Sequence, residues 1–418
     1  MKVFKFGGAS INSIDRIKNV SNLLKNYTHQ PLLVVISAMG KTTNALEKVA
    51  ESFYNGNNDE ALQLFNVIKQ SHITTAKYLL VTGYNKTMED LTSFFTEVEW
   101  LLHDKPVQSF DYYYDQVVCI GEMLSTCIVS AYLNEMGISN QWFDVRDIIR
   151  TDNNFRDANI CWEETMTNLD KMDIKNKPGM YITQGFIGAT DQNESTTLGR
   201  EGSDFTAAIF SNLLDAENLT IWKDVEGVMS SDPKLFPSAA LISELSFNEV
   251  IEMAFYGAQV IHPKTIKPLQ NKKIVLQVKS FLDPSLPGTT ISNKTSKNLP
   301  PVIVLKKQQV LVHLQSQDYS FVGGKPISRL YEMLSELNLQ PNLTQTAAIN
   351  LQICLDDRSE KIEHLAAMAS SIFEVQIEKG LTLLTIRHFT ETLLTEMIQQ
   401  KDVVLLQKTK ETVQVLYR

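Results

Sequence analysis

The first forty residues alternate between strand-like and helix-like hydrophobic patterns. A short apolar run at residues 3–6 ends at two glycines, and apolar residues then recur at helical spacing over 11–24. The next run, 32–38, is apolar without interruption, which is typical of a strand buried on both faces of a parallel sheet. A strand, a glycine turn, a helix and a second strand make one βαβ unit. Repetition of this unit predicts an α/β fold, a mainly parallel sheet with helices on both faces.

The alternation is interrupted once and then resumes. Residues 43–111 are polar and helical in pattern, so we expect a helical insertion on the sheet. Further strands are expected at 180–187, 219–222 and 273–279. The capping-box pattern of Ser246 and Glu249 predicts the start of a helix. Residues 283–301 are rich in Pro, Ser, Thr and Asn and are expected to form an interdomain linker.

The pattern beyond the linker indicates a second domain. Residues of about 309–378 follow the order βαββαβ of a ferredoxin-like unit. A second unit begins near 379 and ends at 418, before its last helix and strand. It is therefore either shortened or borrows a strand at 302–305. We expect a first domain over 1–297 and a second over 298–418.

Composition narrows the class of protein. Lys and Arg number 39 and Asp and Glu 48, and the net charge of −9 is not concentrated in any run, so nucleic acid is not an expected partner. The 4 cysteines form no CxxC pair, which argues against a disulfide scaffold or thiolate zinc site and fits the reducing cytoplasm. The apolar stretch 116–134 could span a bilayer by length, but it contains Glu122, so we expect no membrane association.

Two loops of small residues follow the first two predicted strands. In KFGGAS (5–10), the glycines allow an anion to approach the backbone, the following helix offers unpaired N–H groups, and Lys5 adds a positive charge. SAMGKTTN (37–44) repeats the design. The carboxyl ends of neighbouring parallel strands meet at one sheet edge, where α/β proteins bind ligands. Each loop taken alone is also compatible with a packing turn or a helix cap.

Three later positions add charge to this edge. Glu122 is a lone carboxylate in an apolar helix. It therefore either occupies the one solvent-exposed position of that helix, pairs with an internal arginine, or binds a cation such as an ammonium group. The segment TTLGREGSD (196–204) combines glycines with Arg200, whose guanidinium can bind a carboxylate through two hydrogen bonds. The segment WKDVEGVMSSDPK (222–234) follows the end of the predicted strand at 219–222. Its lysines could contact phosphates, although turn chemistry also explains its Asp-Pro and glycine. No cluster has metal-ligand spacing.

Taken in order, these segments resemble the signature loops of aspartate kinases. The matching segments are KFGGAS, SAMGKTTN, Gly121-Glu122, QGFIGAT, TTLGREGSD, WKDVEGVMSSDPK, EMAFYGAQVIHPKT and the PGT of the linker. The C-terminal modules resemble the regulatory ACT pair of these enzymes, so the resemblance covers essentially the whole chain. It implies an amino acid kinase fold followed by ACT modules. It also implies ATP-dependent phosphorylation of the L-aspartate side chain to 4-phospho-L-aspartate, the first step of lysine, threonine and methionine biosynthesis.

The resemblance also implies roles for individual residues. Catalytic roles fall on Lys5 and on Asp204, which would organise that lysine. Nucleotide contacts fall on Lys5, Gly7, Gly8, Ser10, Lys223, Asp224 and Lys234. Substrate contacts fall on Ser37, Thr43, Glu122, Arg200 and Ser203. Among these, Glu122 would receive the substrate's ammonium group and Arg200 its α-carboxylate.

The chemistry of such a reaction agrees with the residue types present. A free aspartate side chain, with a pKa of about 3.9, is ionised at neutral pH and needs no general base. The obstacle is repulsion between an anionic acceptor and the triphosphate of ATP. Cationic side chains, oriented N–H groups and Mg²⁺ bridging the phosphates reduce it.

Three departures from the family pattern concern the nucleotide loops and regulation. Glu201 stands where the family usually has glycine, and Gln259 where many members have lysine. The last ACT-like unit is shortened. The first unit keeps Asp318 and Asn342 at positions that resemble an effector pocket. Our hypothesis is that lysine or threonine binds there, at an interface of paired ACT modules in a homodimer or higher homo-oligomer.

Two other functions remain open at this stage. One is a related kinase acting on glutamate, N-acetylglutamate or a nucleotide. The pair of Glu122 and Arg200 favours a free amino acid, because an acetylated one has no ammonium group. The other is a catalytically weak amino-acid sensor, against which the retention of Lys5, Arg200 and Asp204 argues.

Overall fold

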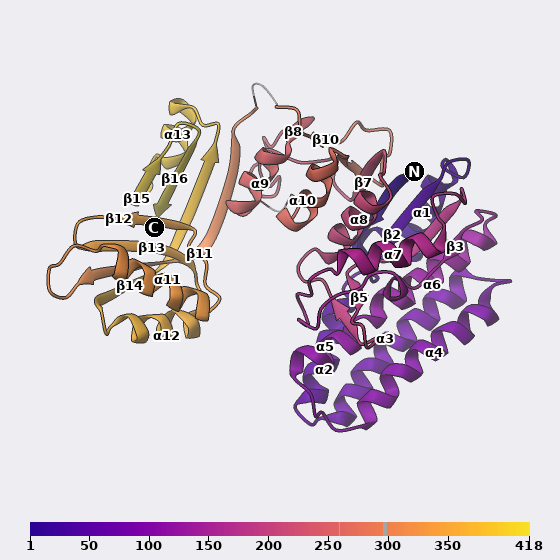
Figure 1. The fold of residues 1–418 in the computed structure, drawn as a ribbon. Helices are drawn as coiled ribbons and strands as arrows, with labels where there is room; N and C mark the ends of the chain where they lie inside the picture. The colour runs from indigo at the N-terminus through magenta and orange to yellow at the C-terminus, as the bar shows by residue number, and fades with distance from the viewer. Residues whose placement is uncertain (259, 296–298) are drawn as a thin grey trace. The chain divides into compact units, whose positions relative to one another are not determined.

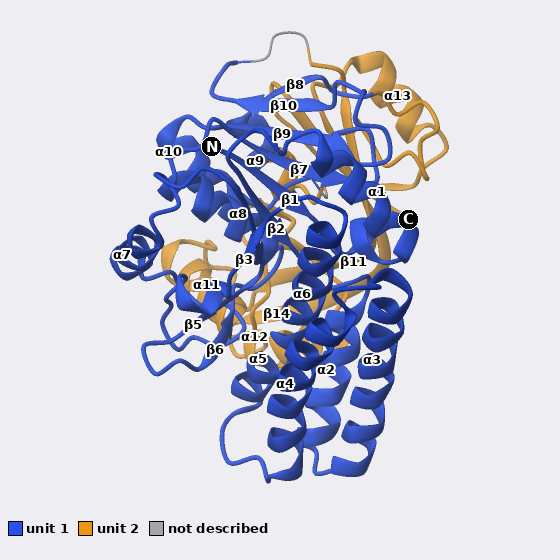
Figure 2. Cartoon of the chain, turned by 90° about the vertical axis from the view of Figure 1, so that its right-hand side faces the viewer, with its two compact units in different colours: residues 1–228, 241–251, 259–296 blue, residues 229–240, 252–258, 297–418 orange. Residues whose placement is uncertain are grey.

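The chain forms two compact units. The computed structural model describes residues 1–258, 260–295 and 299–418 (Figure 1), so Gln259 lies outside the described residues. The first unit comprises 1–228, 241–251 and 259–296, and the second comprises 229–240, 252–258 and 297–418 (Figure 2). Two segments expected in the first domain, 229–240 and 252–258, therefore belong to the second unit.

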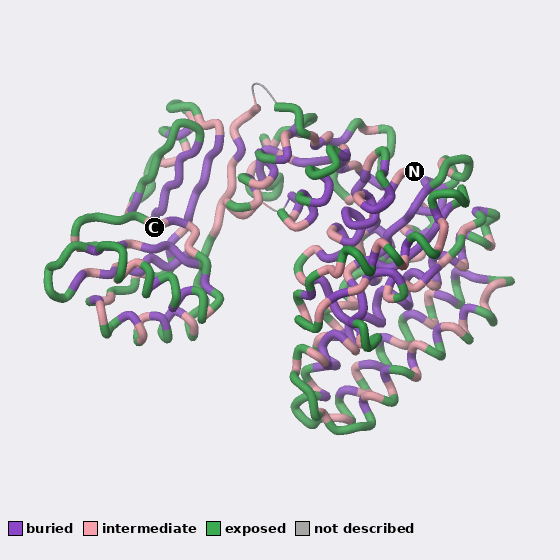
Figure 3. The backbone as a smooth tube through the Cα atoms, in the orientation of Figure 1, coloured by how far each residue is buried: buried purple, intermediate pink, exposed green. Residues whose placement is uncertain are grey.

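An eight-stranded sheet organises the first unit, in the order β3-β4-β2-β1-β7-β9-β10-β8. Its strands are β1 (Lys2–Phe6), β2 (Leu32–Ile36), β3 (Gln141–Trp142), β4 (Met180–Gln184), β7 (Asn218–Lys223), β8 (Glu244–Ser246), β9 (Val275–Ser280) and β10 (Thr289–Ser292). All neighbouring pairs are parallel except β9 and β10. All five residues of β2 are buried, as its continuous apolar pattern predicts. Figure 3 shows the same burial along the central strands. The predicted mainly parallel α/β fold is confirmed.

Helices surround this sheet. They are α1 (Ile14–Lys25), α2 (Thr42–Tyr54), α3 (Asn58–Leu79), α4 (Tyr84–His103), α5 (Phe110–Val118), α6 (Ile120–Glu135), α7 (Trp162–Met172), α8 (Gly202–Leu213), α9 (Phe247–Phe255) and α10 (Pro263–Lys272), with short 3₁₀ turns η1 (Gly8–Ile11) and η2 (Val145–Asp147). The helical insertion is confirmed as α2, α3 and α4, which Figure 1 shows at one end of the unit. The segment 110–135 is apolar and long enough to cross a membrane, but 83% of its most apolar window is buried inside the unit. It is thus a core helix pair.

Two predictions for the first unit need correction. The strand expected over 180–187 is divided, because Phe186 has a φ of 72° and turns the chain out of the sheet into β5 (Ile187–Ala189), which pairs with β6 (Ser195–Thr197). The expected linker contains β10. Gly288, with a φ of 71°, makes a turn in which a Cβ atom would lie 2.3 Å from the carbonyl oxygen of Val278, so the chain returns antiparallel to β9.

The second unit is built on a six-stranded antiparallel sheet, in the order β12-β13-β11-β14-β16-β15. Its elements are β11 (Val302–Ser316), α11 (Gly324–Glu336), β12 (Leu343–Thr346), β13 (Asn350–Asp356), α12 (Ser359–Ala369), β14 (Phe373–Arg387), α13 (Glu391–Ile398), β15 (Val403–Lys408) and β16 (Thr412–Tyr417).

The strands β11 and β14, each 15 residues long, serve both modules. Residues 309–316 of β11 pair with the first half of β14 in the complete module. Residues 302–306 pair with the second half of β14, beside β16 and β15. A register shift after Lys306 separates the two halves. The shortened module therefore borrows the strand at 302–305, which was one of the two expected alternatives.

Candidate functional site

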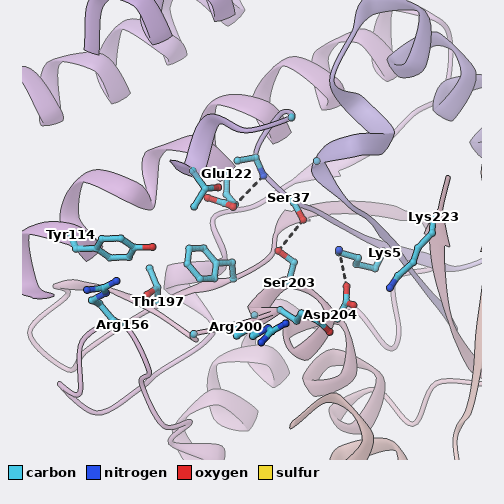
Figure 4. Close-up of a pocket in the computed structure, with 18 residues that line it drawn as sticks. Lys5, Ser37, Tyr114, Glu122, Arg156, Thr197, Arg200, Ser203, Asp204 and Lys223 are labelled. Carbon is cyan, nitrogen blue, oxygen red and sulfur yellow. Dashed lines mark hydrogen bonds and ion pairs between the residues drawn. The ribbon is translucent and has the colours of Figure 1, made fainter. Parts of the chain in front are cut away.

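A pocket of about 560 Å³ opens in the first unit, where the loops after β1 and β2 meet the start of α8 (Figure 4). It brings together most of the residues singled out in the sequence. The predicted residues that line it are Lys5, Gly8, Ser37, Thr43, Glu122, Arg200, Ser203, Asp204 and Lys223.

The first two loops are joined directly. The N–H of Gly40 donates a hydrogen bond of 3.0 Å to the carbonyl oxygen of Gly8. A Cβ atom on Gly8 would lie 2.6 Å from the carbonyl oxygen of Ala38 and 2.7 Å from that of Gly40, so only glycine fits there. The expectation that these loops share one sheet edge is confirmed.

Lys5 and Asp204 form an ion pair at one end of the pocket. Lys5 Nζ lies 2.7 Å from Asp204 Oδ1, and the two side chains are only 12% and 5% exposed. Burial alone would raise the pKa of Asp204, but the charges of Lys5 and Lys223 outweigh it and lower this pKa below its usual value. Asp204 therefore stays ionised and holds the Lys5 ammonium group at the end of β1.

Glu122 faces the pocket from α6. It is 2% exposed, and its Oε1 accepts a hydrogen bond of 3.2 Å from the N–H of Ala38. Its Oε2 has no hydrogen-bond partner among the described residues. Burial raises the pKa of Glu122 to about 8, although the Ala38 N–H and the Lys5 charge oppose the shift. A cation entering the pocket would restore the ionised form and satisfy the free oxygen.

Hydroxyl and guanidinium groups also line the pocket. Ser37 Oγ, after β2, donates to Ser203 Oγ, in the first turn of α8, at 2.9 Å (Figure 4). Arg200 is exposed and makes no ion pair within the part of the chain that the structure describes, so its guanidinium is available to an anion. Its neighbour Glu201 has a φ of 54° and turns its Oε2 to the N–H of His262, at 2.9 Å. Glu201 thus braces the start of α10.

The predicted nucleotide residues divide into two groups. Lys223 lines the pocket, and its Nζ donates to the carbonyl oxygen of Val260 at 2.9 Å. Ser10 is buried and donates to the carbonyl oxygen of Trp222 at 3.4 Å, which ties η1 to β7. The described residues that line the pocket do not include Gly7, Ser10, Asp224 or Lys234, and Lys234 belongs to the second unit.

The other described residues that line the pocket were not predicted as site residues. Tyr114 and Arg156 lie outside every quoted motif, whereas Ala38, Gly40, Phe186, Thr197, Gly199, Glu201 and Gly202 lie within one. In these motifs, the functional interpretation rested on the glycines and the charged residues, and not on Phe186 or Thr197. Arg156 does not follow a predicted strand. The position of the strand ends therefore could not indicate that it lines the pocket.

The two predicted effector residues lie toward different ends of β13 within one chain, and their role at an interface of paired modules stays a prediction. Ser316, two residues before Asp318, donates its N–H to the carbonyl oxygen of Ile349, whereas the N–H of Asn342 donates to the carbonyl oxygen of Cys354, toward the other end of β13. The side chain of Asn342 is already engaged, accepting from Lys306 Nζ at 2.7 Å and donating to Gln309 and Asp356. Hydrogen bonds from neighbouring serines lower the pKa of Asp318 to about 2.

A preformed metal site is not found within residues 1–258, 260–295 and 299–418, which contain no group of three His, Cys, Asp or Glu side chains placed to hold an ion.

Comparison with known proteins identifies the family to which the chain belongs. Residues 1–280 match the model of the amino acid kinase family. The chain is 32% identical over 370 residues to aspartokinase 2, chloroplastic, of Arabidopsis thaliana, covering 85% of this chain and 66% of that protein. It is 30% identical over 396 residues to lysine-sensitive aspartokinase 3 of Escherichia coli, covering 92% and 86% respectively.

Two solved structures have the same fold. One is E. coli aspartokinase III in complex with aspartate and ADP, in the R-state, with a TM-score of 0.83, 26% identity and coverage of 100% of this chain and 96% of that chain. The other is E. coli aspartokinase III with lysine and aspartate, in the T-state, with a TM-score of 0.81, 26% identity and coverage of 100% and 95%.

Proposed function

Because the chain belongs to the amino acid kinase family, and within it to the aspartokinases, we propose that it transfers the γ-phosphoryl group of ATP to the side-chain carboxylate of L-aspartate. The product is 4-phospho-L-aspartate. The observation that carries this proposal is the distribution of charge in one pocket. Among the described residues, Glu122 Oε2 has no hydrogen-bond partner and Arg200 makes no ion pair, while Lys5 is held by Asp204 beside Lys223.

The acceptor end suits a free amino acid. The Oε2 atom of Glu122 would receive the ammonium group, and Arg200 would bind the α-carboxylate through paired hydrogen bonds. The hydroxyl groups of Ser37, Ser203 and Thr43 would contact the rest of the substrate. An N-acetylated amino acid would leave the buried Glu122 oxygen without a charged partner, which is unfavourable.

The phosphoryl end suits charge stabilisation. Lys5, oriented by Asp204, would neutralise charge on the transferring group, and Lys223 and the backbone around Gly8 would contact the nucleotide phosphates. The acceptor carboxylate is already ionised, so its oxygen attacks the γ-phosphorus while the bond to the β-phosphate bridging oxygen breaks and ADP leaves. Contacts of Gly7, Ser10, Asp224 and Lys234 with the nucleotide stay predictions.

Mg²⁺ is expected to accompany ATP. Mg²⁺ in such sites keeps several waters and is held largely by substrate phosphates, so it does not require a preformed carboxylate cluster.

One assay tests the reaction against its alternatives. ADP release is measured with Mg-ATP and, in turn, aspartate, glutamate, N-acetylglutamate and uridylate. Turnover restricted to aspartate is the expected result. Turnover restricted to another acceptor would replace the proposed substrate, and no turnover with any acceptor would favour the amino-acid sensor.

Regulation and setting form a second part of the proposal. Lysine is the effector we expect on the second unit, since a similar structure contains lysine and a relative is named lysine-sensitive. We expect the ACT modules to pair in a homodimer or higher homo-oligomer, in the cytoplasm, where the four free thiols stay reduced. Isothermal titration with lysine and threonine tests the effector, and heat with neither would reject it. Light scattering tests assembly, and a monomeric mass would reject it.

A further inference from the structure

Arg156 lines the pocket although no sequence motif pointed to it. In Figure 4 it lies beside Tyr114 and Thr197, at the opposite side of the view from Lys5 and Lys223. This is the acceptor side of the pocket if the proposed function holds, and the inference below rests on that function.

The backbone of Arg156 is held in an unusual conformation. Its φ is 69°, in the left-handed region that favours glycine over other residues. Its N–H donates to Asp115 Oδ2 at 2.9 Å. Asp115 is fully buried and also accepts hydrogen bonds from the N–H of Thr197 at 2.8 Å and from its hydroxyl at 2.7 Å. One buried carboxylate thus fixes two adjacent parts of the pocket wall.

The side chain of Arg156 is also held in place, across the pocket wall. Its guanidinium carbon lies 4.3 Å from the centre of the Tyr114 ring. Its nitrogens pair with Glu47 at 3.4 Å and with Asp111 at 3.3 Å. Both acids are partly or largely exposed, at 36% and 55%, so these pairs orient the guanidinium more than they bind it tightly. A residue whose backbone is kept at an unfavourable φ, and whose side chain lines a ligand pocket, is expected to have a functional role.

We propose that Arg156, stacked on Tyr114, forms the end wall of the acceptor compartment and limits the length of the amino acid that can react. Glu122 and Arg200 hold the ammonium and α-carboxylate groups, while the reacting carboxylate must reach the phosphoryl group beside Lys5. An acceptor with one more methylene, such as glutamate, fits only if its α-carbon recedes toward Arg156. The guanidinium and the tyrosine ring occupy that space.

The variant Arg156→Gly tests this wall. Glycine adopts a φ of 69° without strain and keeps the N–H that bonds to Asp115, so the fold should be retained. We expect kcat/KM for glutamate relative to aspartate to rise about 10-fold or more, the usual value of one methylene in a shaped pocket. Arg156→Lys, which keeps the charge but not the planar stack, should give a smaller rise.

Three readouts make the outcome decisive. Thermal unfolding must show that Arg156→Gly is as stable as the wild type. A glutamate-to-aspartate ratio that stays within about twofold of wild type, or falls, would overturn the wall. If the wild type does not phosphorylate aspartate, the proposed function fails separately. Calorimetric titration of aspartate and glutamate then decides the wall from binding alone, where an unchanged affinity ratio in Arg156→Gly rejects it.

Discussion

The two ends of the pocket each bury a carboxylate, and their pKa shifts have opposite signs. Glu122, 2% exposed, has no hydrogen-bond partner for its Oε2 atom within the described part of the chain, and burial raises its pKa to about 8. Asp204 is buried and desolvated as well, but the charges of Lys5 and Lys223 reverse the effect and lower its pKa. The cation of Asp204 is therefore part of the protein, whereas that of Glu122 must arrive with a ligand.

This difference separates a preorganised end from an end that the substrate completes. A buried ion pair such as Lys5 with Asp204 keeps its charges aimed before any ligand binds, which is the condition for stabilising a transition state. A lone buried carboxylate does not stabilise the protein without ligand, but the ammonium group of a bound ligand gives it a partner of opposite charge. We therefore expect changes at the first end to lower kcat and changes at the second to raise KM.

Lys5→Ala should have the largest effect. Removal of an aimed charge at a reacting centre lowers kcat by about 100- to 1000-fold, while the aspartate KM should change little. Steady-state kinetics with Mg-ATP measures both. Lys48→Ala, on the exposed face of α2, is the matched control and should leave both constants unchanged. Nearly full kcat in Lys5→Ala would remove the distinction between the two ends.

Glu122→Gln should raise the aspartate KM by about 10- to 100-fold, because hydrogen bonds to charged groups contribute about 1.5–3 kcal/mol. The change keeps the shape of the side chain and removes its charge. Kinetics at saturating ATP measures it, with the exposed Glu51→Gln as control. A KM within twofold of wild type would mean that Glu122 does not meet the ammonium group.

The pH dependence of stability should depend on the same residue. The pKa of Glu122 rises from an ordinary 4.5 to about 8 on folding, so the folded state holds the proton over this interval. The free energy of unfolding without ligand should therefore fall as pH increases from 4.5 to 8, by at most about 1.4 kcal/mol per pH unit. Urea unfolding across this range measures the slope, which should be shallower in Glu122→Gln. Equal slopes in both proteins would contradict the raised pKa.

Ser10→Ala should have the smallest effect and tests which residues of the first loop meet the nucleotide. The Oγ of Ser10 bonds to the carbonyl oxygen of Trp222, so we expect a loss of about 0.5–1 kcal/mol in stability and an unchanged ATP KM. Gly8→Ala is the contrasting variant, because its Cβ atom would lie 2.6 Å from the carbonyl oxygen of Ala38. A raised ATP KM in a stable Ser10→Ala would mean that the hydroxyl group of Ser10, and not only its backbone, meets the nucleotide.

The sequence predicted best where a residue's position follows from strand order. Lys5 and Ser37 end neighbouring parallel strands, so their proximity could be inferred from hydrophobic periodicity. Ser246 also behaves as predicted, accepting the N–H of Glu249 at 3.1 Å. Arg156 could not be found this way, since its place depends on hydrogen bonds to Asp115 from a loop distant in sequence. The effector role of Asp318 and Asn342 stays a prediction, and strand register, which the sequence pattern does not give, decides toward which end of β13 each residue lies.

Because β11 and β14 each run through both C-terminal modules, these modules share two strands, whose pairing shifts in register after Lys306. Neither can melt, swing or be cut away without leaving half of two long strands unpaired, and exposed strand edges of that kind favour aggregation. The covalent chain of both strands therefore connects the two modules directly, and natural variation that trims the complete module must preserve residues 302–306 for the other to survive.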